Sequence, residues 1–243
     1  MMRKPNTLPD QRIYVVGDIH GRADLLVRLL AEIEKDAQSY PKKNKKIIFL
    51  GDYIDRGLDS KKVIDLLLQP FPEKIDPVFL RGNHDNYLLR FLKGDFDIAL
   101  RWLEFGGLAC LASYGIRGAG LPTPKKMEAL HDELKEKMPS EHKAFFKNTL
   151  ASVTFGDYFF AHAGARPFVP LDQQVDEDKM TIRGEFLFSD YEFESVIVHG
   201  HTIKTEPEIR PNRIGIDTGA YATGVLTCLI LDGQTQGFMN TKD

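Results

Sequence analysis

The chain has 243 residues, of which 42% are hydrophobic and 28% charged, a composition typical of a globular domain. Its 32 basic and 35 acidic side chains give a net charge of −3, which excludes a molecule-wide positive field that would attract nucleic acid. The two cysteines, Cys110 and Cys228, lie too far apart in sequence for a thiolate zinc motif, and they are too few for a disulfide framework. We therefore expect a cytoplasmic protein with no membrane and no nucleic-acid partner.

The first third of the chain alternates short apolar runs with helical patterns. Three β-rich runs, each ending in polar residues, predict buried strands at 13–17, 46–51 and 77–81. Leucine, valine and isoleucine recur at helical spacing over 23–39 and 60–69. Strands that alternate with helices in this way predict a parallel sheet covered by helices.

The middle of the chain, about 86–150, has helical patterns and is predicted to be a helical insertion. In it, Trp102, Phe105 and Leu108 are predicted to belong to the helix core, while His131 and His142 lie in charged stretches and are expected to face solvent. Strand patterns return from residue 153 onward. No repeat or long linker divides the chain, so we expect one domain, 1–243, with an N-terminal tail over about 1–11.

Five polar clusters stand at the ends of apolar runs. They are Gly17-Asp18-Ile19-His20-Gly21, Gly51-Asp52-Tyr53-Ile54-Asp55-Arg56-Gly57, Gly82-Asn83-His84-Asp85, Ala161-His162-Ala163-Gly164 and His199-Gly200-His201-Thr202. Because the carboxyl ends of adjacent parallel strands meet at one edge of a sheet, the first three clusters should face each other. The last two can close the other side of the same crevice.

The side chains of these clusters suit divalent metal ions. Carboxylate, imidazole and amide groups, with no thiolate, come from Asp18, His20, Asp52, Asn83, His162 and His201. Six such groups exceed what one ion takes, so we expect two divalent ions bridged by one carboxylate. Two such ions can clamp the attacking and leaving oxygens of a phosphoryl displacement. Manganese is the expected metal, and iron and zinc are the alternatives.

The ordered motifs GDIHG, GDYIDRG, GNHD, HAG and GHT resemble the metallophosphoesterase (calcineurin-like) superfamily, and within it the PPP-type serine/threonine phosphatases of the compact bacterial and lambda phage kind. The resemblance implies a layered α/β fold of the α+β type, in which helices flank a central β-sandwich of mixed sheets with a dimetal site at strand carboxyl ends. It also implies that Asp18 and His20 hold the first metal, that Asp52 bridges, and that Asn83, His162 and His201 hold the second.

The same resemblance assigns the catalytic and substrate-binding residues. His84 would be the general acid that protonates the leaving oxygen, and Asp55 would fix its ring. Arg56 would grip phosphate oxygens, and Asn83 would contact substrate as well as metal. A second arginine is usual in a motif resembling W-x-R-x-x-F-L; Arg183 in TIRGEFL matches it without the tryptophan, and Arg166 and Arg210 are weaker candidates.

Three positions bear on the reaction. Ile203 stands where related nucleases and phosphodiesterases carry a final metal-binding histidine, which points away from them. Asp55 favours the phosphatases over diadenosine tetraphosphate hydrolases, which often lack it, whereas Asp85 in GNHD points the other way, since protein phosphatases often have GNHE. We therefore expect a phosphomonoesterase that hydrolyses phosphoserine, phosphothreonine and small aryl phosphates by direct attack of a metal-bridging hydroxide.

The alternative is a diadenosine tetraphosphate-type nucleotide pyrophosphohydrolase, so the substrate is a phosphoprotein or a phosphorylated small molecule. The sequence leaves three residues open. His199 either supports a ligand or is structural, Asp217 either orients a ligand or caps a turn, and Tyr221 can line the mouth of the site.

Overall fold

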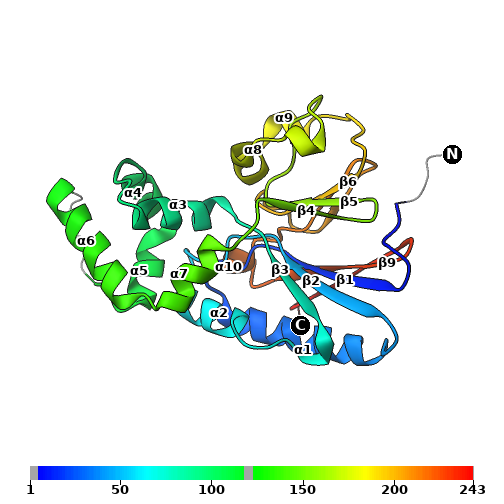
Figure 1. The fold of residues 1–243 in the computed structure, drawn as a ribbon, viewed down its shortest axis with the longest axis horizontal. Coiled ribbons are helices and arrows are strands. Elements are labelled where there is room, and N and C mark those ends of the chain that lie inside the picture. The colour runs from blue at the N-terminus through cyan, green and yellow to red at the C-terminus, as the bar shows by residue number, and fades with distance from the viewer. Residues whose placement is uncertain (1–4, 118–122, 243) are drawn as a thin grey trace.

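Two mixed β-sheets stack face to face in the computed structural model, which describes residues 5–117 and 123–242 (Figure 1). The first sheet has the order β10-β9-β1-β2-β3, with β1 (Gln11–Val16), β2 (Asn44–Phe49), β3 (Asp76–Phe79), β9 (Thr227–Asp232) and β10 (Thr235–Asn240). The second has the order β4-β5-β6-β8-β7, with β4 (Ser152–Phe155), β5 (Tyr158–Ala161), β6 (Val196–His199), β7 (Glu208–Ile209) and β8 (Arg213–Gly215). The layered α/β sandwich expected from the sequence is confirmed.

The strands that end in the polar clusters are parallel within each sheet. In the first sheet, β1, β2 and β3 run parallel. On the other side of β1, β9 pairs antiparallel with β1, and β10 pairs antiparallel with β9. In the second, β5, β6 and β8 run parallel. The three strands predicted in the first third of the chain are confirmed, whereas β10 had not been predicted, because its sequence, TQGFMN, carries no apolar run.

Helices cover the outer face of each sheet. On the first sheet lie α1 (Ala23–Gln38) and α2 (Ser60–Leu67), and on the second lie α8 (Asp176–Thr181) and α9 (Gly184–Leu187) (Figure 1). A helical lobe beside the sheets holds α3 (Asn83–Leu92), α4 (Asp97–Trp102), η2 (Leu103–Gly107), α5 (Leu108–Ser113), α6 (Pro124–Lys137) and α7 (Ser140–Lys147). The shorter elements are η1 (Pro72–Lys74), η3 (Leu171–Gln173) and α10 (Ala220–Thr223). No helix in the described ranges is long and apolar enough to cross a membrane.

The central strand β1 is buried on both faces. Tyr14 and Val16 pack with the cluster under α1 and α2, and Ile13 and Val15 pack between the two sheets. Complete burial of an aliphatic side chain stabilises a fold by about 1.5–3 kcal/mol. The rigid two-sided packing of β1 therefore fixes where its carboxyl end points.

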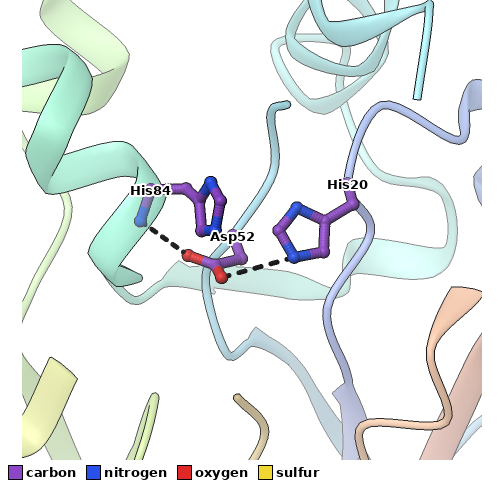
Figure 2. Close-up of side chains that lie close together, drawn as sticks. All are labelled: His20, Asp52 and His84. Atoms are coloured by element: carbon purple, nitrogen blue, oxygen red, sulfur yellow. Dashed lines mark hydrogen bonds and ion pairs between the residues drawn. The ribbon is translucent and has the colours of Figure 1, made fainter. Parts of the chain in front are cut away.

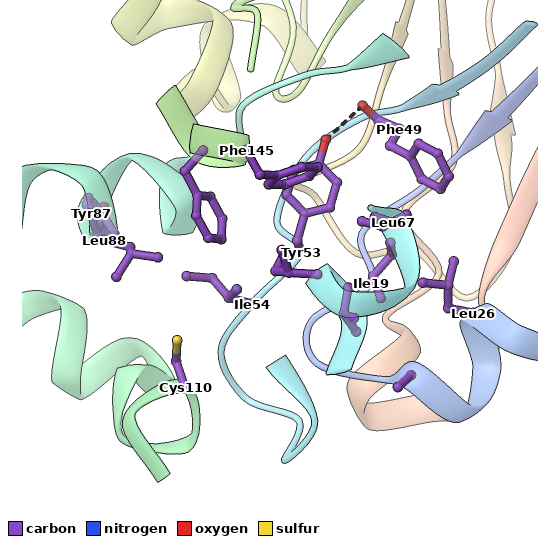
Figure 3. Packing of buried hydrophobic residues seen from close by; sticks show 14 of the residues in the cluster. Ile19, Leu26, Phe49, Tyr53, Ile54, Leu67, Tyr87, Leu88, Cys110 and Phe145 are labelled. Carbon is purple, nitrogen blue, oxygen red and sulfur yellow. Dashed lines mark hydrogen bonds between the residues drawn. The ribbon is translucent and has the colours of Figure 1, made fainter. Parts of the chain in front are cut away.

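The loop after β2 is anchored in the same core (Figure 3). Tyr53 and Ile54 are fully buried, and the Tyr53 hydroxyl donates a hydrogen bond to the carbonyl of Leu80 at 2.6 Å. These buried anchors fix the backbone at the two flanking polar residues, Asp52 and Asp55.

Several residues of the helical lobe differ from expectation. His142 does not face solvent: it is 1% exposed, and its ring nitrogens lie 2.9 Å from the Tyr114 hydroxyl and 3.0 Å from an Asp65 carboxylate oxygen. His131 is also largely buried, with its ring 5.7 Å from that of Phe91. Both predictions were wrong because charged neighbours in sequence do not keep a side chain in solvent: His131 packs against Phe91 although Asp132 beside it is 81% exposed.

The segment after α4 also differs from expectation. Trp102 is fully buried as predicted, but Phe105 is 41% exposed and Leu108 is 48% exposed. The reason is that the helix changes to a π-helix at η2, which shifts the helical spacing on which the prediction depended.

Candidate active site

The carboxyl ends of β1, β2, β5, β6 and β8 and the loop after β3 meet at one cleft of about 630 Å³. The predicted residues that line it are His20, Asp52, Arg56, Asn83, His84, Arg183 and His201. Asp18 and His162 lie directly beneath, 2% and 0% exposed. The five sequence motifs therefore converge as expected.

Asp52 lies at the centre of the cluster (Figure 2). Its Oδ2 atom is 3.4 Å from His20 Nε2 and 3.4 Å from His162 Nε2, and its Oδ1 atom accepts a hydrogen bond from the His84 backbone N–H at 3.0 Å. The carboxylate is thus flanked by imidazoles from both sheets. This is the position that a carboxylate shared between two cations would occupy.

The second group of donor atoms surrounds His162. Its Nε2 atom lies 3.1 Å from Asn83 Oδ1 and 3.2 Å from His201 Nδ1. Asp18 approaches from β1 and accepts hydrogen bonds from the His201 backbone N–H at 3.1 and 3.2 Å. The first and last motifs of the sequence are therefore linked directly.

Backbone carbonyls fix the orientation of two histidine rings. His20 Nδ1 lies 2.8 Å from the carbonyl of Ile54, and His162 Nδ1 lies 3.0 Å from the carbonyl of Leu50. Since each Nδ1–H donates to a carbonyl, Nε2 faces the cluster. Burial lowers the pKa of His20 to about 3, so its ring is neutral with an Nε2 lone pair available to a cation.

Buried negative charge dominates the electrostatics of the site. Burial raises the pKa of Asp18 well above its ordinary value, with Asp217 adding to the effect, and burial raises the pKa of Asp217 to about 6. Burial alone would lower the pKa of His162, but the carboxylates of Asp52 and Asp18 outweigh it and raise that pKa to about 10. So many carboxylates in one buried place favour bound positive charge.

These residues fit two divalent cations. Within the described residues, the ligand atoms of two three-residue groups lie within 4.8 Å of one another: His20, Asp52 and His84, and Asp52, His162 and His201. Asp52 is common to both groups, and all donors are oxygen or imidazole nitrogen. The donor set and the shared carboxylate are those of a dinuclear centre.

A buried triad stands beside this centre. His84 Nδ1 lies 2.6 Å from Asp55 Oδ2, and the indole N–H of Trp102 donates to the same oxygen at 2.9 Å. Burial would lower the pKa of His84, but the carboxylates of Asp52 and Asp55 raise it above its ordinary value. Sequence reasoning missed the role of Trp102, although a buried indole N–H requires an acceptor and so signalled one.

Two of the predicted arginines, Arg56 and Arg183, line the cleft. Arg56 hydrogen-bonds through Nη1 to the Tyr221 hydroxyl, its guanidinium lies 4.5 Å from the centre of the Tyr221 ring, and its Nη2 is 3.5 Å from His84 Nε2. Arg183, which lies between α8 and α9, also lines the cleft. The weaker candidates are used elsewhere: Arg166 pairs with two carboxylates, those of Asp178 and Glu185, and Arg210 is 57% exposed and pairs with Glu208.

The backbone is strained where the functional side chains project. Positive φ angles, from 47° to 72°, occur at His20, Asp52, Asp55, Arg56 and His201. Such conformations are unfavourable for residues other than glycine and persist only where the surrounding structure imposes them. Their concentration at this cleft is typical of a functional site.

Asp85, the last residue of GNHD, holds two loops together. Its carboxylate accepts backbone hydrogen bonds from Gly82 at 2.9 Å, Asp52 at 2.8 Å and Tyr53 at 3.2 Å. The loops are so close that a Cβ on Gly82 would lie 2.0 Å from Asp52 Oδ1. Asp85 is therefore a structural clamp rather than a substrate contact.

The residues that the sequence left open have distinct places. Asp217 accepts a hydrogen bond from the Gly219 N–H at 2.9 Å and also lines the cleft. The Tyr221 ring lies 5.4 Å from the His20 ring. His199 is buried, and its ring centre lies 5.1 Å from that of Phe186. Its Nδ1 atom lies 3.0 Å from the carbonyl oxygen of Gly200, so the ring packs within the second sheet's layer.

The layered fold and the cluster of oxygen and imidazole ligands together define a metal-dependent hydrolase of phosphate esters or anhydrides. The sequence model of the calcineurin-like phosphoesterases matches residues 11–220. The chain therefore belongs to the calcineurin-like phosphoesterase family, whose members use a dimetal centre. The family resemblance inferred from the motifs is confirmed.

Relatives of known name match along most of the chain. It is 31% identical over 239 residues to the asymmetrical bis(5'-nucleosyl)-tetraphosphatase PrpE of Oceanobacillus iheyensis, covering 89% of this chain and 87% of that protein. Among solved structures, a proposed diadenosine tetraphosphatase superposes with a TM-score of 0.66 at 21% identity over 98% of this chain and 99% of the other. A protein serine/threonine phosphatase from Saccharomyces cerevisiae superposes with a TM-score of 0.55 at 14% identity, covering 97% and 81%. At these identities the two structures show the shared fold alone.

Proposed function

We propose that the protein hydrolyses dinucleoside tetraphosphates asymmetrically, releasing a nucleoside triphosphate and a nucleoside monophosphate. The similarity to PrpE along nearly the full length of both chains supports this reaction over hydrolysis of phosphoproteins. It is the alternative that the sequence left open. Asp55, which had favoured a protein phosphatase, orients His84, and that role suits any leaving oxygen that needs a proton.

The observation in the structure that supports the proposal is the set of arginine side chains that line the cleft. Three arginines line it, Arg56, Arg101 and Arg183, around a single cluster of metal-ligand groups. One phosphoryl group is held by one or two guanidinium groups, since each can bind two of its oxygens. A chain of phosphates offers oxygens to all three. Arg101 had not been singled out from the sequence, because no motif surrounds it.

Each predicted ligand has a defined place in the proposed mechanism. Asp18 and His20 would hold one ion and Asp52 both, and the second ion would be held by Asn83, His162 and His201. Manganese is our first choice, with iron and zinc as alternatives. When bound, such ions supply a nucleophilic water of lowered pKa and neutralise the charge that develops on the phosphoryl group. Arg56, Arg183 and Asn83 would hold the reacting phosphate in line.

His84 would complete the hydrolysis. As the new oxygen–phosphorus bond forms, the bridging oxygen leaves with its electron pair and takes a proton from His84 Nε2. Asp55 holds the opposite nitrogen of the ring, so that Nε2 points into the cleft. The carboxylates of Asp52 and Asp55 raise the pKa of His84, which favours the protonated ring that this donation needs.

A substrate panel with product analysis tests the proposal. With manganese present, we expect diadenosine tetraphosphate to be hydrolysed to ATP and AMP, with a kcat/KM at least tenfold above that for a phosphoserine peptide. The Asp52→Asn variant, made in parallel, controls for contaminating hydrolases. Release of ADP alone would refute asymmetrical cleavage. Hydrolysis of the peptide without hydrolysis of the dinucleotide would refute the substrate class and favour the phosphomonoesterase.

A further inference from the structure

An exposed aromatic ring stands in the wall of the cleft beside the proposed general acid. Phe105 is 41% exposed, lines the cleft, and has its ring centre 6.4 Å from that of His84. Tyr87, which is 8% exposed, supports it from α3: the two rings are stacked at an interplanar angle of 20° with centres 6.2 Å apart. We propose that Phe105, supported by Tyr87, is the surface on which one nucleobase of the substrate stacks. This inference rests on the proposed function, since it names how that substrate is recognised.

The backbone around Phe105 is fixed against the phosphate-binding side of the cleft. Phe105 belongs to the π-helix η2, which bends at Gly106, where φ is 115°. The Gly106 carbonyl accepts a hydrogen bond from the Arg56 N–H at 3.3 Å, and a Cβ on Gly106 would lie 2.9 Å from that nitrogen. The ring is therefore held at a set position relative to Arg56, which is what a substrate with a base joined to phosphates requires.

The charge beside the ring favours a nucleotide over a peptide aromatic side chain. The Arg101 guanidinium lies 5.7 Å from the centre of the Phe105 ring and also lines the cleft. A planar cation next to an aromatic face suits a flat base that carries an anionic phosphate chain. Because Phe105 lies beside His84, the proposed stacking surface is on the side of the cleft from which the leaving group departs.

The test compares two ligands that differ only in the nucleoside. Equilibrium binding of ATP and of inorganic tripolyphosphate is measured by calorimetry on the purified manganese-loaded protein. Stacking of a base on an aromatic ring gives roughly fivefold in affinity at the lower end of its range and more than a hundredfold at the upper end. We expect the wild type to bind ATP about tenfold more tightly than tripolyphosphate, and we expect F105A to lose this preference.

Three further variants distinguish stacking from packing. F105W should keep the preference for ATP, and F105L, which has apolar bulk without a π-face, should lose most of it. L108A changes an exposed side chain on the adjoining helix that does not line the cleft, so it should leave the preference intact. A wild-type protein without the preference, or an F105A variant that retains it, would overturn the inference.

The outcome is separate from that of the proposed function. Hydrolysis of diadenosine tetraphosphate by the wild type decides the reaction, and the binding ratio decides the base site. A protein that prefers ATP through Phe105 but does not hydrolyse the dinucleotide would retain the base site and lose the proposed reaction. A protein that hydrolyses the dinucleotide, but whose preference for ATP over tripolyphosphate is unchanged in F105A, would retain the proposed reaction and lose the base site.

Discussion

Replacement of Trp102 by phenylalanine removes one hydrogen bond from the triad that orients His84. The indole N–H lies 2.9 Å from Asp55 Oδ2, and both residues are 0% exposed, so solvent cannot take the place of the donor. A hydrogen bond to a charged group contributes about 1.5–3 kcal/mol. If half of this free energy is expressed at His84 in the transition state, kcat falls roughly four- to twelvefold while KM stays nearly constant.

The assay uses two aryl phosphates as probes of proton donation. A general acid matters more for a poor leaving group, so W102F should lose more activity on phenyl phosphate than on 4-nitrophenyl phosphate. The control is Phe91→Leu, because Phe91 is buried, packs on Trp102 with ring centres 5.2 Å apart, and has no polar side-chain atom. F91L should lose about 1 kcal/mol of unfolding free energy with kcat within twofold of wild type. An equal loss on both substrates, matched by F91L, would show that Trp102 acts through packing alone.

Three further outcomes are expected. Saturating manganese should raise the melting temperature of the wild type by roughly 5–10 °C and leave D52N unchanged in differential scanning fluorimetry; an equal rise in D52N would argue against Asp52 as a ligand. R183A should lower kcat/KM roughly ten- to hundredfold and R210A by less than twofold, and similar losses in steady-state kinetics would contradict the placement of Arg183 in the cleft. Burial lowers the pKa of His142 despite the nearby Asp65, so the folded state resists protonation and loses stability as pH falls below about 6.5. Urea unfolding at pH 7.5 and 5.0 should show a smaller loss in H142Q than in wild type; an equal loss would refute this linkage.

The sequence predicted which polar side chains converge on the cleft, because each of them follows a strand. Once β1 and β2 were placed, the parallel arrangement required Asp18 and Asp52 to meet, and the structure brings Asp52 within 3.4 Å of two imidazoles from different sheets. Apolar runs and polar strand ends are local patterns, so the sequence displays them directly.

The positions of two aromatic side chains near the cleft, Phe105 and Trp102, could not be predicted in the same way. Phe105 faces the cleft because η2 departs from α-helical geometry, and Trp102 reaches Asp55 across 47 positions of sequence. Neither fact is encoded in a local spacing. The sequence favoured phosphoproteins over dinucleotides for a related reason: Asp55 was taken as a mark of one branch, whereas its contact with His84 suits any reaction whose leaving oxygen needs a proton.

The strand order of the first sheet has a consequence for synthesis on the ribosome. One edge of β1 is covered only by β9, which follows the whole second sheet in sequence. Until β9 has been made, an apolar strand edge stays open on the growing chain, and open edges invite pairing with other chains. Truncation before β9 should therefore yield an aggregating product rather than a smaller folded domain. Chaperones that bind the nascent chain would have to protect the open edge of β1.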